Sequence, residues 1–180
     1  MRVLVFPRQQ LTPDEQIAFA EHWGELIPFP YGSLPGYPNI IELRNRGKAR
    51  DVNQHWHSDM TYIDTPPPAS VLLAVEIPPV GGDTYFADQN AAFDALPEAL
   101  RARIAGLTIK HDASHTSVGT LRPGFEPFDD PRDAPGAAHP IVHTHEETGR
   151  RALYLGRREW AYIPGLELEE SERLLDELWR

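Results

Sequence analysis

The chain has 180 residues, of which 41% are hydrophobic, so it is long enough to bury a core and is not expected to be disordered. It contains no cysteine, which excludes disulfides, thiolate nucleophiles and cysteine-bound zinc or iron–sulfur sites, so any metal must be held by nitrogen and oxygen. The formal net charge of −10 argues against nucleic acid as a partner but allows a small anion bound by one or two arginines.

The N-terminal residues predict a strand followed by a helix. Residues 2–6, RVLVF, are nearly all apolar, so we expect a buried strand. This run is too short for a signal peptide or a membrane span, which indicates a cytoplasmic protein with no membrane partner. A helix should follow, because Thr12 can cap it, Pro13 suits its first position and Glu15 completes a capping box.

The middle of the chain predicts short strands and two helices. Residues 40–43 predict a short strand, 69–77 a buried strand, and 84–87 another strand. Asp88 can cap the helix that follows, and Pro97 opens the next one.

The last third predicts a strand at 107–114, a long irregular segment at 117–138 with four prolines, a hairpin, and an amphipathic helix at 168–179. The hairpin joins 139–145 to 151–156. Many short strands with few helices indicate one β-rich α+β domain over residues 1–180, either a sandwich or a jelly roll.

The stretch NQHWHSDMTY, residues 53–62, concentrates candidate metal ligands. Residues two apart in extended backbone project to the same face, so His57 and Asp59 should point together with Cα atoms roughly 6–7 Å apart. An imidazole nitrogen and a carboxylate oxygen suit a divalent first-row metal, and a second histidine would complete the facial triad of non-haem iron(II) oxygenases. His55 is in phase with His57 and competes for the role. The spacing also fits a solvated histidine beside a capping aspartate.

Other polar residues are weaker candidates. The Thr84 hydroxyl, at the start of a predicted strand, could donate to a carboxylate. His139, His143 and His145 alternate along a predicted strand, so they would share a face and could bind metal. Arg157 and Arg158 could reach a substrate or be solvated, and His22, His111 and His115 are expected at the surface or behind the ligands.

The motifs W-H-x-D, then G-G-D-T, then H-P-x-V-x-T-H and T-G-R occur in that order. In this combination the sequence resembles the taurine/2,4-dichlorophenoxyacetate dioxygenase family of iron(II)- and 2-oxoglutarate-dependent oxygenases, over essentially all 180 residues. The resemblance implies a double-stranded β-helix (jelly roll) core with peripheral helices. It implies hydroxylation of a small organic acid, such as a sulfonate or aryloxy acid, with iron(II) as cofactor, 2-oxoglutarate and O2 consumed, and succinate and carbon dioxide released.

The resemblance also implies roles for single residues. His57 and Asp59 match the first two iron ligands, and Thr84 matches the threonine that hydrogen-bonds a carboxylate of 2-oxoglutarate. Asn53 and Tyr62 match positions that face the primary substrate.

The same resemblance also bears on the substrate and on the histidines of the predicted hairpin. Tyr31 stands where the taurine enzyme has a sulfonate-binding histidine, which favours a substrate other than taurine. The family has histidines at the positions of His139 and His145 but does not use them for iron, so structural roles are expected there.

The family's third ligand, in a motif resembling W-D-N-R-x-x-x-H, and its 2-oxoglutarate-binding arginine do not occur in this sequence. We therefore expect a fragment of such a dioxygenase, incomplete at both ends, and leave open the activity of this chain alone and its homo-oligomerisation. One alternative is a non-catalytic binding domain or remnant. The other is a redox-inert metal hydrolase that uses His57, Asp59 and one of His143 or His145.

Overall fold

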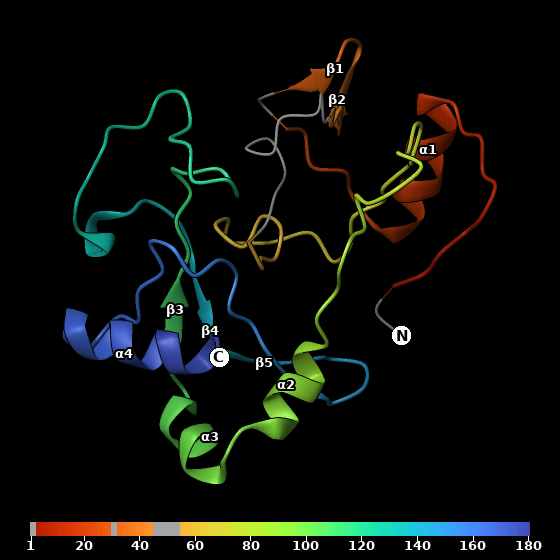
Figure 1. The fold of residues 1–180 in the computed structure, drawn as a ribbon. Coiled ribbons are helices and arrows are strands. Elements are labelled where there is room, and N and C mark those ends of the chain that lie inside the picture. Colours follow the sequence, from red (N-terminus) through yellow and green to blue (C-terminus); the bar gives the residue numbers. More distant parts are fainter. Residues whose placement is uncertain (1–2, 30–31, 45–54) are drawn as a thin grey trace. The chain divides into compact units, whose positions relative to one another are not determined.

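The computed structural model describes residues 3–29, 32–44 and 55–180 (Figure 1). The chain divides into two compact units. Unit 1 comprises Met1–Arg46 and Pro67–Phe86, and unit 2 comprises Gly47–Pro66 and Ala87–Arg180. Each helix of the described residues is too short or too polar to cross a lipid bilayer.

The described residues of unit 1 form one α-helix and one small sheet. Helix α1 (Pro13–Ala20) continues into a 3-10 turn, η1 (Glu21–Trp23), and strands β1 (Ser33–Leu34) and β2 (Tyr37–Ile41) pair antiparallel. The predicted capping box is confirmed: the Glu15 amide donates to the Thr12 hydroxyl at 3.3 Å, and the Thr12 amide donates to the Glu15 carboxylate at 2.8 Å. The strand predicted at 40–43 exists as the second half of β2.

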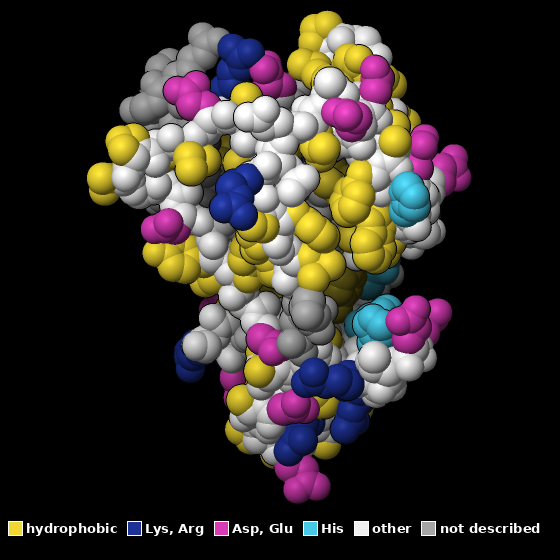
Figure 2. All heavy atoms as spheres, turned by 90° about the vertical axis from the view of Figure 1, so that its right-hand side faces the viewer, with side chains coloured by type: hydrophobic (Ala, Val, Ile, Leu, Met, Phe, Trp, Pro, Cys, Tyr) yellow, Lys and Arg dark blue, Asp and Glu magenta, His cyan; other side chains and the backbone are white. Residues whose placement is uncertain are grey.

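Three predicted strands of unit 1 are wrong. None of the described residues in 2–6, 69–77 or 84–87 forms a strand, and Val5 and Val75 are 80% and 90% exposed. An extended segment becomes a strand only when its backbone N–H and C=O groups find a partner, which composition alone does not provide. Other contacts hold these segments: the ring of Phe6 meets that of Phe19 edge to face at 5.8 Å, and the Gln16 side chain donates to the Val71 carbonyl at 3.2 Å. Hydrophobic side chains are accordingly visible at the molecular surface (Figure 2).

Among its described residues, unit 2 has two antiparallel pairs of strands, three α-helices and one 3-10 turn. The pairs are β3 with β4 and β5 with β6. The elements are α2 (Gln89–Ala95), α3 (Glu98–Ile104), β3 (Thr108–Lys110), η3 (Pro131–Asp133), β4 (Ala138–Pro140), β5 (Val142–Thr144), β6 (Arg151–Leu153) and α4 (Leu168–Leu178).

The helix boundaries of unit 2 agree with the sequence. The Asp88 carboxylate accepts from the amides of Asn90 and Ala91 at 3.0 Å each, as predicted for the cap of α2. Pro97 precedes α3, and α4 covers most of the predicted terminal helix. The segment predicted to be irregular, 117–138, is irregular apart from η3, one isolated bridge between His115 and Leu121, and Ala138, the first residue of β4.

The histidine-rich strand predicted at 139–145 is broken in two. Ile141 is fully buried and is the point where the strand changes partner: its amide donates to the Leu107 carbonyl, next to the β3–β4 pair, and its carbonyl accepts from the Tyr154 amide, next to the β5–β6 pair. His139 on β4 faces Ile109 of β3, whereas His143 on β5 pairs with Ala152 of β6. The prediction that the histidines lie on one continuous strand is therefore wrong, whereas the hairpin is confirmed. The rings of His139 and His143 still contact the same ring, that of Tyr154, at centroid distances of 5.5 and 5.8 Å.

The core of unit 2 forms where α4 covers the short strands (Figure 1). The Ser171 hydroxyl, fully buried on α4, accepts from the Ile163 amide at 2.9 Å and so satisfies a backbone donor inside the core. The large buried apolar side chains are Phe93, Leu100, Ile104, Ile109, Ile141, Leu153, Leu155, Ile163, Leu174, Leu175 and Leu178. Helix and sheet residues thus share one apolar cluster, and the architecture is one of small antiparallel sheets with helices.

Candidate metal-binding site

His57 and Asp59 lie together in unit 2. The His57 Nε2 atom is 3.3 Å from Asp59 Oδ1, so the geometric expectation from their two-residue spacing is confirmed. The other ring nitrogen, Nδ1, lies 2.9 Å from the His55 carbonyl and donates to it, which leaves Nε2 directed at the carboxylate. The side chains are 28% and 64% exposed, so an ion from solvent can reach the pair.

The two groups shift each other's titration. The hydrogen bond to Asp59 raises the pKa of His57, while burial and the Arg157 charge act against this rise. The hydrogen bond from His57 lowers the pKa of Asp59, again against burial. Asp59 is thus held as a carboxylate, and a metal ion would compete with a proton for the imidazole nitrogen.

His55 points to a different partner. Its Nδ1 atom lies 3.5 Å from the Glu159 carboxylate, and its backbone carbonyl accepts from the His57 ring. Of the two histidines that compete in the sequence, the structure therefore places His57 against Asp59.

No third donor joins the pair within the part of the chain that the structure describes. There, no three side chains of histidine, aspartate or glutamate form a group that could hold a metal ion. Neither His143 nor His145 completes a set with His57 and Asp59, so the arrangement that the hydrolase alternative needs is not formed.

Of the residues predicted to bind the cosubstrate or the substrate, the structure describes Thr84 and Tyr62. Thr84 belongs to unit 1 and is exposed, and it does not begin a strand. Tyr62 is half-buried in unit 2, and the guanidinium of Arg122 lies 4.3 Å from its ring centroid, a cation–π contact that the sequence did not indicate. Asn53 and Tyr31 lie outside the described residues.

The backbone that carries the pair is held at several points by unit 2. The Ser58 amide donates to the Gly156 carbonyl at 3.3 Å, and the Tyr62 carbonyl accepts from the Ala137 amide at 3.0 Å. The ring of His139 donates through Nε2 to the Ile63 carbonyl at 3.0 Å. His139 thus has a structural contact, as the resemblance implied.

A buried carboxylate, that of Asp112, lies in the turn that follows β3. Asp112 accepts five hydrogen bonds: from the amide (2.8 Å) and hydroxyl (2.5 Å) of Ser114, from the amide (3.1 Å) and Nδ1 (2.9 Å) of His115, and from Arg157 Nη2 (2.9 Å). The Asp112 side chain is fully buried, and that of Arg157 is only 12% exposed. Arg157 also donates to the Thr116 carbonyl, so it is structural and not solvated. The sequence HDASH, with serine and histidine two and three residues after the aspartate, is the local signal of such a turn.

His111 is buried, so of the two positions expected for it, at the surface or behind the ligands, the surface is excluded. Its exposure is 3%, and neither ring nitrogen has a hydrogen-bond partner among the described residues. The ring packs against those of His139 and Tyr154, at centroid distances of 5.5 and 5.8 Å. Burial, and secondarily the charge of His139, lowers the pKa of His111 to about 4.

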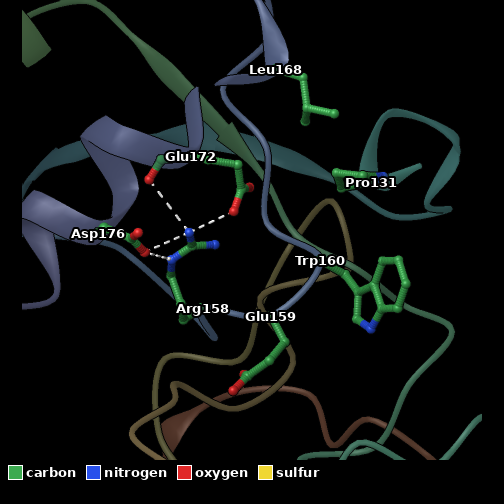
Figure 3. Close-up of a pocket in the computed structure, with 7 residues that line it drawn as sticks. All are labelled: Pro131, Arg158, Glu159, Trp160, Leu168, Glu172 and Asp176. Atoms are coloured by element: carbon green, nitrogen blue, oxygen red, sulfur yellow. Dashed lines mark hydrogen bonds and ion pairs between the residues drawn. The ribbon is translucent and has the colours of Figure 1, made fainter. Parts of the chain in front are cut away.

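A pocket of about 510 Å³ lies elsewhere in unit 2, beside α4 (Figure 3). Arg158 projects into it, but its Nη2 atom lies 2.7 Å from both the Glu172 and the Asp176 carboxylates of α4. This arginine therefore connects the 157–160 segment to α4. The lining residues are Pro131, Arg158, Glu159, Trp160, Leu168, Glu172 and Asp176, and the His57–Asp59 pair is not among them.

Comparison with solved structures gives the class of protein. The chain is similar to a taurine dioxygenase from Burkholderia xenovorans, with a TM-score of 0.72 and 32% identity, over 96% of this chain and 55% of that one. The chain therefore shares its fold class with a dioxygenase of known structure.

Sequence comparison names the family. A profile described as "Taurine catabolism dioxygenase TauD, TfdA family" matches residues 2–180, and the chain belongs to this family. It is 39% identical to an (S)-phenoxypropionate/alpha-ketoglutarate-dioxygenase of Sphingobium herbicidovorans, over 98% of this chain and 64% of that protein. It is 35% identical to an alpha-ketoglutarate-dependent 2,4-dichlorophenoxyacetate dioxygenase of Cupriavidus pinatubonensis, over 98% and 67%. The chain spans about two thirds of the length of these curated relatives.

Replacing Asp112 by asparagine should destabilise unit 2 strongly. The change removes the charge that Arg157 pairs with and turns one acceptor into a donor, which costs about 3–5 kcal/mol for a buried pair. Urea unfolding followed by tryptophan fluorescence measures the loss. Asp130→Asn, which alters the exposed ion pair with Arg132, is the control and should change stability much less. A loss for Asp112→Asn no larger than for the control would contradict this account.

His111 should make the protein less stable in mild acid. The unfolded histidine takes up a proton below pH 6.5, whereas the folded one stays neutral until about pH 4, so protonation favours the unfolded state in this window. At pH 5.0, which is 1.5 pH units below the pKa of the unfolded histidine, this lowers the free energy of unfolding by about 2 kcal/mol. Unfolding free energies at pH 7.5 and 5.0 should therefore differ more for the wild type than for His111→Gln. Equal differences would show that His111 titrates normally.

Proposed function

We propose that the protein of this chain is an iron(II)- and 2-oxoglutarate-dependent dioxygenase that hydroxylates a small organic acid. The observation that carries the proposal is the His57–Asp59 donor pair, 3.3 Å apart within the W-H-x-D motif of a family member. The relatives named above are described as alpha-ketoglutarate-dependent and act on aryloxy acids, which supports the cosubstrate and this class of substrate. In the proposed reaction 2-oxoglutarate, O2 and the acid give succinate, carbon dioxide and the hydroxylated acid.

The donor chemistry of the pair fits iron(II). One imidazole nitrogen and one carboxylate oxygen are two of the three ligands of a two-histidine, one-carboxylate site, which leaves positions open for other ligands. Bound iron would supply the redox chemistry with O2 and would bring the cosubstrate into place. The hydrogen bond from His57 Nδ1 to the His55 carbonyl orients the ring, so that Nε2 is the nitrogen available to the ion.

The other predicted residues have binding roles in this proposal. The Thr84 hydroxyl donates to a carboxylate of 2-oxoglutarate, and Asn53 and Tyr62 face the organic acid. The fold proposed is a double-stranded β-helix, with both units in one oxygenase domain. The likeness to the taurine dioxygenase structure and the profile match across residues 2–180 support it.

His57→Ala and Asp59→Ala should each weaken metal binding by about tenfold or more, because each removes one of two protein ligands. Binding of Mn(II), a stand-in for iron(II) that resists oxidation, can be followed by the loss of the free-ion EPR signal. His55→Ala is the matched control, since this ring contacts Glu159 and not Asp59, and its affinity should stay close to that of the wild type. A greater loss for His55→Ala would reverse the assignment of the two histidines.

Thr84→Val should weaken 2-oxoglutarate binding by roughly ten- to a hundredfold, because a hydrogen bond to a charged group contributes about 1.5–3 kcal/mol. Isothermal titration of the Mn(II)-loaded protein measures the effect, and Mn(II) affinity itself should not change. Thr148→Val, at the exposed hairpin turn, is the control. An unchanged affinity in Thr84→Val would leave Thr84 without a role in cosubstrate binding.

A further inference from the structure

Ser58, between His57 and Asp59, makes the backbone contact nearest to both. Its amide donates to the Gly156 carbonyl at 3.3 Å. Fixing this amide restricts the peptide plane between His57 and Ser58, and this plane helps to set the direction in which the His57 side chain leaves the backbone relative to Asp59. The separation of the two donor atoms therefore depends on where residue 156 lies.

Gly156 is buried and leaves no room for a side chain. Its φ of +65° lies in the left-handed region that favours glycine. A Cβ atom there would lie 2.1 Å from His111 Nδ1, 2.5 Å from His111 Cε1 and 2.8 Å from the Thr61 hydroxyl oxygen. The His111 ring is 3% exposed and packs against His139 and Tyr154, so it cannot move aside freely.

Gly156 touches the ligand-bearing segment on both sides of Asp59. Its carbonyl meets Ser58, and its α-carbon faces Thr61, which is 4% exposed. The next residue, Arg157, is tied to Asp112 at 2.9 Å. A side chain at position 156 would therefore push the 58–61 segment away, because the opposite side is held by a buried ion pair.

We propose that Gly156 is a positioning residue for metal binding. Its missing side chain lets the 156 carbonyl reach the Ser58 amide, and this close approach sets the geometry of the His57–Asp59 pair. The proposal rests on the proposed function, since it takes this pair as metal ligands.

The test compares two glycines with nearly the same backbone conformation. Gly149 has a φ of +66°, and a Cβ atom added there would meet no atom within 4 Å, so Gly149→Ala carries the backbone strain of Gly156→Ala without its clash. Gly156→Ala should weaken Mn(II) binding by about tenfold or more, and Gly149→Ala by no more than about twofold, measured by EPR well below each variant's unfolding temperature. Equal affinities of wild type and folded Gly156→Ala would overturn the proposal, as would equal losses in the two variants.

Removing the His111 ring separates positioning from a general loss of stability. If the clash with this ring displaces the segment, the double variant Gly156→Ala/His111→Ala should bind Mn(II) within about threefold of His111→Ala alone. If Gly156→Ala alone fails to fold, this comparison still tests the positioning role. A tenfold lower Mn(II) affinity in the double variant than in His111→Ala would overturn the proposal. His57→Ala is the reference: if it binds Mn(II) like the wild type, the proposed function fails, whereas its loss with normal binding by Gly156→Ala refutes only the positioning role.

Discussion

The candidate site depends on one interaction, the ion pair between the buried carboxylate of Asp112 and Arg157. A fully buried carboxylate is stable only when its oxygens accept hydrogen bonds. The donors to Asp112 come from its own turn and from Arg157, 45 residues further along the chain. The ion pair fixes the segment after β6 against the segment after β3. Gly156 precedes Arg157, so the same pair determines where the Ser58 amide can bind and, through it, where His57 and Asp59 point.

The two units differ in how their apolar residues are used. In unit 2 the apolar side chains of α4 and of strands only three residues long meet in one cluster, because the helix covers what the short sheets cannot. In unit 1 apolar segments such as 69–77 keep exposed side chains, with Val75 90% exposed. Hydrophobicity creates a tendency to be buried, but a partner surface has to be present for burial to occur.

Three arginines of unit 2 are held by contacts within the fold. Arg157 and Arg158, adjacent in sequence, connect to different parts of unit 2: the first to the Asp112 turn and the second to the carboxylates of α4. Arg122 instead stacks on the ring of Tyr62, three residues beyond Asp59. In a chain with a net charge of −10, these three arginines are thus each used for a contact within unit 2.

Local features of this protein could be predicted from the sequence alone. The capping box of Thr12 and Glu15, the Asp88 cap and the closeness of His57 to Asp59 involve residues two to three positions apart, so backbone geometry nearly determines them. The combination of the W-H-x-D, G-G-D-T, H-P-x-V-x-T-H and T-G-R motifs likewise sufficed to indicate the family.

Only the tertiary structure decided which segments find partners. The break at Ile141 that separates His139 from His143, the burial of His111 and the meeting of Gly156 with Ser58 all depend on residues tens of positions apart. No local propensity encodes such contacts, because closing the intervening loops is favourable only once the whole core has assembled.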